Sequence, residues 1–207
     1  VGCSRIDYSF EFGSNKKNNS KKLFTIIYYA IQDVVSLPYI RGKFYNLPNE
    51  NLENYTWNNN ASKFEKILFE YMCQNKNINL IIKTKTGNPD QIKRLKKFEQ
   101  FKNVKIINEG TGSYLLKYAD LCIAFNSTII YEAMASIKPV LIPLVDIKKQ
   151  YKKFTFDFSQ TTNIFEFETK KKFFELMKKF LNKEIKFDQK ISAMNLKKLE
   201  IEVGNSD

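Results

Sequence analysis

Five short apolar runs, separated by helix-like segments, set the fold class of this chain. The runs are continuously apolar instead of alternating between apolar and polar residues, which is typical of parallel strands buried on both faces of a sheet. Strands that alternate with helices are typical of the α/β class. The predicted strands are residues 23–30, 78–84, 103–108, 120–125 and 139–144.

A helix is predicted over 62–74, because Phe64, Leu68 and Tyr71 fall on one helical face and Ser62 is a suitable cap. The sequence therefore predicts a Rossmann-like, doubly wound parallel sheet with helices on both faces. Further helices are predicted over residues 89–101, 112–119, 127–136, 169–182 and 187–200.

A length of 207 residues suits one domain. Residues 1–22 are polar and irregular, so we expect a linker or leading segment there and a single Rossmann-like domain over 23–207. Residues 31–59 are predicted to be a long loop, since they hold two of the five prolines and many asparagines. The chain starts at Val1 and stops without a closing element, so we expect it to be a piece of a longer polypeptide.

The charge balance favours an anionic partner. The chain has 34 basic and 22 acidic residues, a net charge of +12, which suits nucleic acid, a membrane surface or a phosphorylated small molecule. A biased genome composition explains the excess of lysine equally well. There is no histidine, so histidine cannot supply acid–base chemistry or a metal ligand from this segment, and the three separated cysteines indicate reduced thiols.

The crossover over 119–143 carries the strongest chemical signal. Asn126, Ser127 and Thr128 follow the fourth predicted strand, at the edge where ligands of such sheets bind. Hydroxyls and backbone amides at a helix start suit a phosphate, and Glu132, about one turn deeper, can accept hydrogen bonds from the two hydroxyls of a ribose. Together these groups describe a nucleotide site. The alternative is an ordinary crossover, in which Ser or Thr caps the helix and the dipole favours a nearby Glu.

Two further loops reach the same predicted edge. Thr111, Gly112 and Ser113 follow the third strand, and the glycine would let the backbone approach a ligand closely, although a tight turn explains it as well. Lys83 and Lys85 end the second strand, where an exposed lysine is the default in so basic a chain.

The stretch YADLCIAFNSTIIYEAMASIKPVLIP, residues 118–143, resembles the donor-binding half of GT-B glycosyltransferases, especially those of bacterial surface and capsular polysaccharide biosynthesis. Two shorter stretches extend the likeness. VGCSRID (1–7) is similar to the segment that opens the C-terminal domain of these proteins and of their UDP-sugar epimerase cousins, and GNSD (204–207) is similar to the stretch before their last helix.

The resemblance implies roles for the residues at this edge. Ser127 and Thr128 would hold the diphosphate of a nucleotide sugar, with Asn126 beside them, and Glu132 would hold its ribose. The loop 111–114 would flank the base or phosphates. In the family, the second strand commonly ends in Lys-x-His-Pro. This chain has the lysine, Lys83, but lacks the histidine.

The resemblance also implies an activity and its partners. The expected reaction is transfer of a sugar from a nucleotide-activated donor to a surface glycan or a lipid-linked glycan, without a cofactor or bound metal. The general base would lie in an N-terminal acceptor domain, so this segment alone would bind a donor without turning it over. A cytoplasmic enzyme, peripheral at the inner face of the membrane, fits the basic surface.

Two other functions stay open. A nucleotide-sugar 2-epimerase shares this architecture. A basic module for nucleic acid or anionic membranes is the non-enzyme alternative, and KKKFFELMKKFL, residues 170–181, is its best candidate helix. That helix more commonly packs Phe173, Phe174, Met177 and Leu181 against a sheet. Nucleic acid is not expected as a partner, because most aromatic residues fall inside apolar helix faces and strands.

Overall fold

A computed structural model describes nine ranges of the chain: residues 23–31, 39–40, 43–44, 58–85, 89–125, 127–146, 158, 161–185 and 189–198. The linker predicted over 1–22, the residue Asn126 and the segment 204–207 lie outside the described residues.

The core of the fold is a six-stranded parallel sheet with the order β5-β4-β1-β6-β7-β8. The five predicted strands are confirmed with small differences at their ends. The sixth strand, β8, was not predicted: Glu166 interrupts its four-residue apolar run, and only one of the four residues is buried. The strands are β1 Phe24–Tyr29, β4 Ile78–Lys83, β5 Val104–Ile107, β6 Leu121–Ala124, β7 Val140–Pro143 and β8 Ile164–Phe167.

The direction in which strands are added reverses at β1. Tyr28 of β1 is paired with Ile82 of β4 on one side and with Ile123 of β6 on the other. The chain builds outward from β1 through β4 and β5, and then returns to place β6, β7 and β8 on the opposite side. Such a reversal leaves a crevice at the carboxyl ends of β1 and β6, where open α/β sheets bind their ligands.

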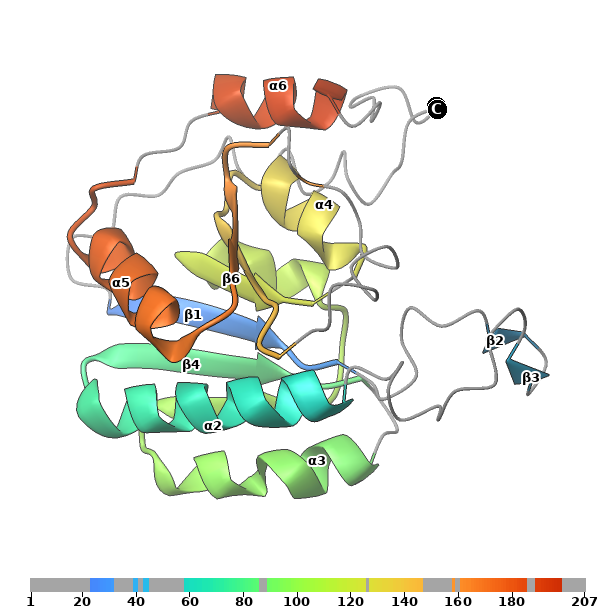
Figure 1. Cartoon of the computed structure of the whole chain (residues 1–207), viewed down its shortest axis with the longest axis vertical. Helices are drawn as coiled ribbons and strands as arrows, with labels where there is room; N and C mark the ends of the chain where they lie inside the picture. Colours follow the sequence, from blue (N-terminus) through green and yellow to red (C-terminus); the bar gives the residue numbers. More distant parts are fainter. Residues whose placement is uncertain are drawn as a thin grey trace.

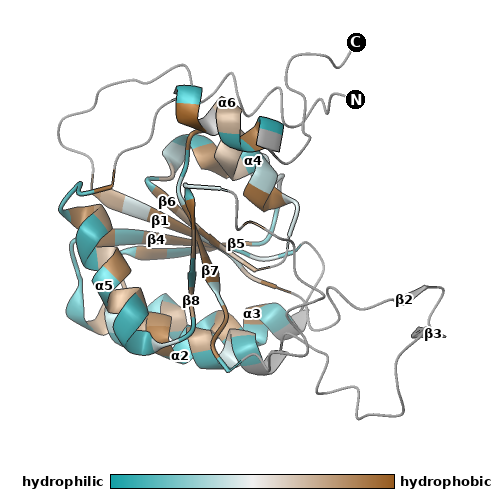
Figure 2. Cartoon of the chain, turned by 45° about the horizontal axis from the view of Figure 1, so that its top comes forward, coloured by the Kyte–Doolittle hydropathy of each residue, from teal (hydrophilic) through white to brown (hydrophobic). Residues whose placement is uncertain are grey.

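Helices cover both faces of the sheet, as predicted (Figure 1). The helices α2, α3 and α5 lie on one face, and α4 and α6 lie on the other (Figure 2). The described helical segments are α2 Asn58–Gln74, α3 Pro89–Leu95, η2 Lys96–Gln100, η3 Ser113–Tyr118, α4 Ile129–Ala135, α5 Lys170–Leu181 and α6 Gln189–Lys198.

Three helix and loop boundaries differ from the prediction. Helix α2 begins at Asn58, so Ser62 lies inside it and is not its cap. The helix predicted over 89–101 is an α-helix that tightens into the 3₁₀ segment η2 after Leu95. The long loop predicted over 31–59 contains a small separate hairpin, β2 Tyr39–Ile40 and β3 Lys43–Phe44.

Phe64 is the centre of the core on the α2 face. It is fully buried, and its ring contacts the rings of Tyr28, Phe125, Phe167 and Phe173 at centroid distances between 5.4 and 6.0 Å. These contacts join β1, the end of β6, β8 and α5. Edge-to-face packing of this kind adds about 0.5–1.5 kcal/mol per pair beyond area burial.

Helix α5 buries the apolar stripe that its sequence predicted. Phe173 and Met177 are fully buried, and Phe180 is 6% exposed. Leu181 was predicted to pack against the sheet but is 37% exposed, because it lies about 100° around the helix from Phe180. The apolar face is therefore part of the core. Among the described residues, no helix is both long and apolar enough to cross a bilayer.

Candidate functional site

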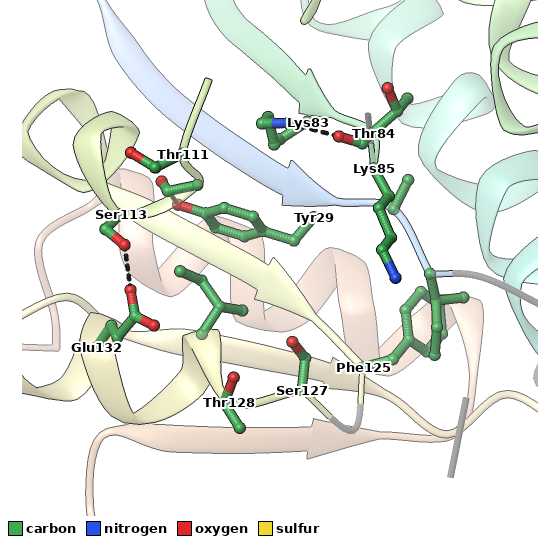
Figure 3. A pocket seen from close by; sticks show the side chains of 14 residues that line it. Tyr29, Lys83, Thr84, Lys85, Thr111, Ser113, Phe125, Ser127, Thr128 and Glu132 are labelled. Carbon is green, nitrogen blue, oxygen red and sulfur yellow. Dashed lines mark hydrogen bonds between the residues drawn. The ribbon is translucent and has the colours of Figure 1, made fainter. Parts of the chain in front are cut away.

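A cavity of about 470 Å³ lies at the carboxyl ends of β1, β4 and β6, at the reversal point of the sheet. Four loops and the start of α4 form its walls (Figure 3). The structure brings seven predicted site residues together here, and Asn126, the eighth, lies outside the described residues. The seven are Lys83, Thr111, Gly112, Ser113, Ser127, Thr128 and Glu132.

The hydroxyls of Ser127 and Thr128 are not used to cap α4. Thr128 occupies the N-cap position, but its side chain makes no capping hydrogen bond. Instead, the amides of Ile130 and Tyr131 donate to the backbone carbonyls of Ser127 and Thr128, each at 3.1 Å. Among the described residues, neither hydroxyl has a hydrogen-bond partner. The side-chain capping bond expected for an ordinary crossover is therefore not formed among the described residues, whereas Thr128 does occupy the N-cap position and Glu132 does lie in the first turn of α4.

Glu132 reaches the pocket from the first turn of α4. It is only 4% exposed, and its Oε2 accepts a hydrogen bond from the hydroxyl of Ser113 (Figure 3). A carboxylate offers about four lone-pair sites, so it can accept from more than one hydroxyl. The bond joins the loop after β5 to α4, although the two residues are 19 positions apart.

Gly112 makes a close approach, but to a protein side chain. A Cβ on Gly112 would lie 3.1 Å from Cε1 of Tyr29. The Tyr29 hydroxyl donates to the Gly112 carbonyl at 3.0 Å. Sequence reasoning did not select Tyr29, although its place near the end of a predicted strand put it at the ligand-binding edge. Gly110, not Gly112, has the left-handed backbone of a turn, with φ of 72°.

The two lysines after β4 differ in their surroundings. Lys83 is only 7% exposed, and its Nζ donates to the carbonyl of Thr84 at 2.6 Å. Desolvation by burial lowers the pKa of Lys83. Within the described part of the chain it forms no ion pair. The expectation of a default exposed lysine is therefore wrong for Lys83 but right for Lys85, whose amine points toward Ser127 and Phe125 (Figure 3).

Helix α3 supports the pocket from behind, through residues that sequence reasoning also missed. The Gln91 side chain is 1% exposed, accepts from the Lys85 amide at 2.9 Å and donates to the Ala30 carbonyl at 3.3 Å. Arg94 donates to the carbonyl of Ile31 at 3.3 Å. These bonds fix the backbone where β1 and β4 end.

The arrangement suits a polyanion that also carries hydroxyl groups. Two amines, the hydroxyls of Ser127 and Thr128 and one buried carboxylate face the same cavity. Amines and hydroxyls donate to phosphate oxygens, whereas a carboxylate accepts from alcohols. Within the described ranges, no three His, Cys, Asp or Glu side chains are grouped to hold a metal ion.

No protein-family model matches the chain, and no curated protein matches its sequence. Solved structures share its fold. The UDP-GlcNAc 2-epimerase of Methanocaldococcus jannaschii, in complex with UDP-GlcNAc and UDP, is similar over 97% of this chain and 54% of its own, with a TM-score of 0.51 and 17% identity. The likeness confirms the Rossmann-like α/β fold, and the chain spans about half of that epimerase.

Two further solved structures match the chain at lower TM-scores. The UDP-GlcNAc 2-epimerase of Neisseria meningitidis, bound to UDP-GlcNAc, covers 92% of this chain and 42% of its own, with a TM-score of 0.49 and 15% identity. KpsC of Thermosulfurimonas dismutans, a β-Kdo 2,4 transferase, covers 69% of this chain and 45% of its own, with a TM-score of 0.37 and 13% identity.

Proposed function

We propose that this chain is the donor-binding domain of a glycosyltransferase that moves a sugar from a nucleotide-activated donor to a surface polysaccharide. One observation carries the proposal: cations, hydroxyls and a buried carboxylate from four separate segments converge on one cavity at the reversal point of the sheet. The resemblance of residues 118–143 to GT-B donor-binding domains supports it independently.

The diphosphate would bind between the lysines and the hydroxyls. Burying an ammonium group without an anionic partner costs solvation free energy. A phosphate that binds beside it would offset this cost through charge-assisted hydrogen bonds. Among the described residues, Lys83 has this character. Lys85, two residues further along the chain, lines the same cavity. Ser127 and Thr128 would donate from the β6 side. In a glycosyl transfer, these groups would stabilise the charge that develops on the leaving diphosphate.

Glu132 would bind the ribose. A carboxylate this close to phosphates would repel them if it touched them directly, so its favourable partner is an alcohol. Ser113 already shows that the carboxylate accepts from a hydroxyl. The loop Thr111–Ser113 would flank the base or phosphates. Asn126, between β6 and Ser127, is proposed to act beside the diphosphate on sequence position alone.

The whole enzyme would need a second, acceptor-binding domain that supplies the general base. The donor would bind without a cofactor or metal ion, and the acceptor would be a glycan or a lipid-linked glycan. We place the enzyme in the cytoplasm, peripheral to the membrane. This chain alone would bind nucleotide sugar without turning it over.

A nucleotide-sugar 2-epimerase is the second candidate, because an epimerase is the structure that matches this fold at a TM-score of 0.51. The products separate the two activities. A full-length epimerase inverts one sugar carbon and leaves the nucleotide attached, whereas a transferase releases free nucleotide only when acceptor is present.

The basic-module alternative receives less support. Its candidate helix α5 buries its apolar stripe in the core, so that stripe does not face a membrane or RNA. Phe64 and Tyr71 are buried and Phe69 is packed against the core, so these aromatic rings do not form a stacking platform.

Calorimetric titration of the 207-residue chain with UDP, CMP, CDP and GDP tests the proposal. We expect saturable binding of one nucleotide, weakened by Glu132→Ala and by the Ser127→Ala/Thr128→Ala pair. Thr161→Ala is a suitable control, because its hydroxyl bonds the Phe158 carbonyl away from the pocket. Failure of every nucleotide to bind would refute the proposal, and salt-dependent binding to RNA or anionic vesicles would then support the basic module.

A further inference from the structure

Tyr29 holds the loop after β5 in two ways. Its hydroxyl bonds the Gly112 carbonyl at 3.0 Å, and its ring lies where a Cβ on Gly112 would approach to 3.1 Å. Tyr29 is itself 9% exposed, so the ring has little freedom to move. Burial raises the pKa of Tyr29 well above its ordinary value, and Cys122 and Glu132 add to the rise. The hydroxyl therefore stays protonated and remains a donor.

The fixed carbonyl controls the residue that bonds Glu132. The carbonyl of Gly112 and the amide of Ser113 belong to one planar peptide unit, so orienting the first orients the second. Ser113 then donates from its hydroxyl to Oε2 of Glu132 (Figure 3). These two hydrogen bonds connect the end of β1 to the loop after β5, and that loop to α4, although the three segments are far apart in sequence.

We propose that Tyr29 is a positioning residue that gives the pocket its preference for a ligand with a vicinal diol, by holding Gly112 and Ser113 so that Glu132 keeps one orientation. The inference rests on the proposed function, since the diol is the ribose of the nucleotide. A carboxylate with a fixed orientation discriminates between one hydroxyl and two, whereas a carboxylate that rotates adapts to either.

The adjacent residue provides a matched control. Tyr28 is also a buried tyrosine of β1, and its hydroxyl also makes one hydrogen bond, to Oε1 of Glu65 at 2.9 Å. Successive strand residues point to opposite faces of the sheet, so Tyr28 faces α2 and does not line the pocket. Tyr28→Phe and Tyr29→Phe thus remove the same group from the same strand.

Titration with UDP, CDP and GDP, each beside its 2′-deoxy form, tests the diol preference. We expect the wild type to prefer the ribonucleotide about tenfold, the value of one hydrogen bond to a charged group. Tyr29→Phe should reduce the preference to about threefold or less, and Tyr28→Phe should leave it unchanged. If both variants keep the wild-type preference, the positioning role is wrong, while the proposed nucleotide site stands.

A double-mutant cycle on unfolding tests the same link without any ligand. Tyr29→Phe and Ser113→Ala should be non-additive, whereas Tyr28→Phe and Ser113→Ala should add, because only the first pair shares the Gly112 peptide. Additivity in both pairs overturns the inference. Coupling in the first pair without binding of any nucleotide refutes the proposed function and the diol preference, and leaves only the link between Tyr29 and Ser113.

Discussion

Arg94 Nε lies 3.0 Å from Oε2 of Glu65, whose side chain has no solvent-exposed surface. The same guanidinium donates to the carbonyl of Ile31, which lines the pocket, and Glu65 also accepts from the hydroxyl of Tyr28. This pair therefore connects α2 and α3 to the end of β1. Arg94 is the member of this network that contacts the pocket wall, through the Ile31 carbonyl.

We expect Arg94→Met to destabilise the chain by about 3–5 kcal/mol, because it leaves the Glu65 carboxylate buried without its cation. The double variant Arg94→Met/Glu65→Met should recover much of that loss, since it removes both charges. Urea unfolding of the wild type and the variants measures these values. A loss below about 1 kcal/mol in the single variant would show that Glu65 is not held by Arg94.

Glu65 should also make stability depend on pH. Burial raises the pKa of Glu65 above its ordinary value of 4.5, although Arg94 and Tyr28 oppose the rise. The folded chain then binds this proton more tightly than the unfolded chain. The stabilisation is fully present below pH 4.5 and is lost as the pH rises through the raised pKa. As the pH rises above 4.5, the free energy of unfolding of the wild type should therefore fall relative to that of Glu65→Gln, which has no proton to lose at this position. A difference that does not vary with pH would contradict this.

Lys83 should make anion binding depend on pH in the alkaline range. Its pKa is lowered from 10.5 by desolvation, so the amine loses its charge at a lower pH than an ordinary lysine. The phosphates of UDP are fully ionised there, with a pKa near 6. The affinity for UDP should fall as the pH rises through the lowered pKa of Lys83. Lys83→Arg should not show this fall, because a guanidinium stays charged up to about pH 12. The same fall in both proteins would exclude Lys83 as its source.

The two glycines before Ser113 should respond differently to alanine. Gly112→Ala forces the buried ring of Tyr29 to move by a few tenths of an ångström, so nucleotide binding should weaken about tenfold or more. Gly110→Ala meets no atom within 4 Å, but its φ of 72° costs stability of about 1 kcal/mol. Unfolding and titration of both variants separate the effects. Equal losses of binding would show that loop strain, and not Tyr29, governs the site.

The sequence identified the sheet and most of the site because both depend on local patterns. Apolar runs marked the four inner strands and the edge strand β5, and the carboxyl ends of parallel strands meet at one edge, so Lys83, Ser113 and Ser127 were expected together. Strand β8 was not predicted, because Glu166 interrupts its four-residue apolar run. Leu181 was misplaced because the boundary of a buried stripe shifts with small rotations of a helix.

The sequence by itself determined the α/β class, the parallel sheet and the chemistry of the groups at its ligand-binding edge. Only the tertiary structure decided how those groups are held. Tyr29 meets Gly112 across 83 residues, and Gln91 meets Ala30 across 61. Contacts of this kind have no period or motif, because they depend on which strands become neighbours and on the direction in which each side chain leaves the sheet.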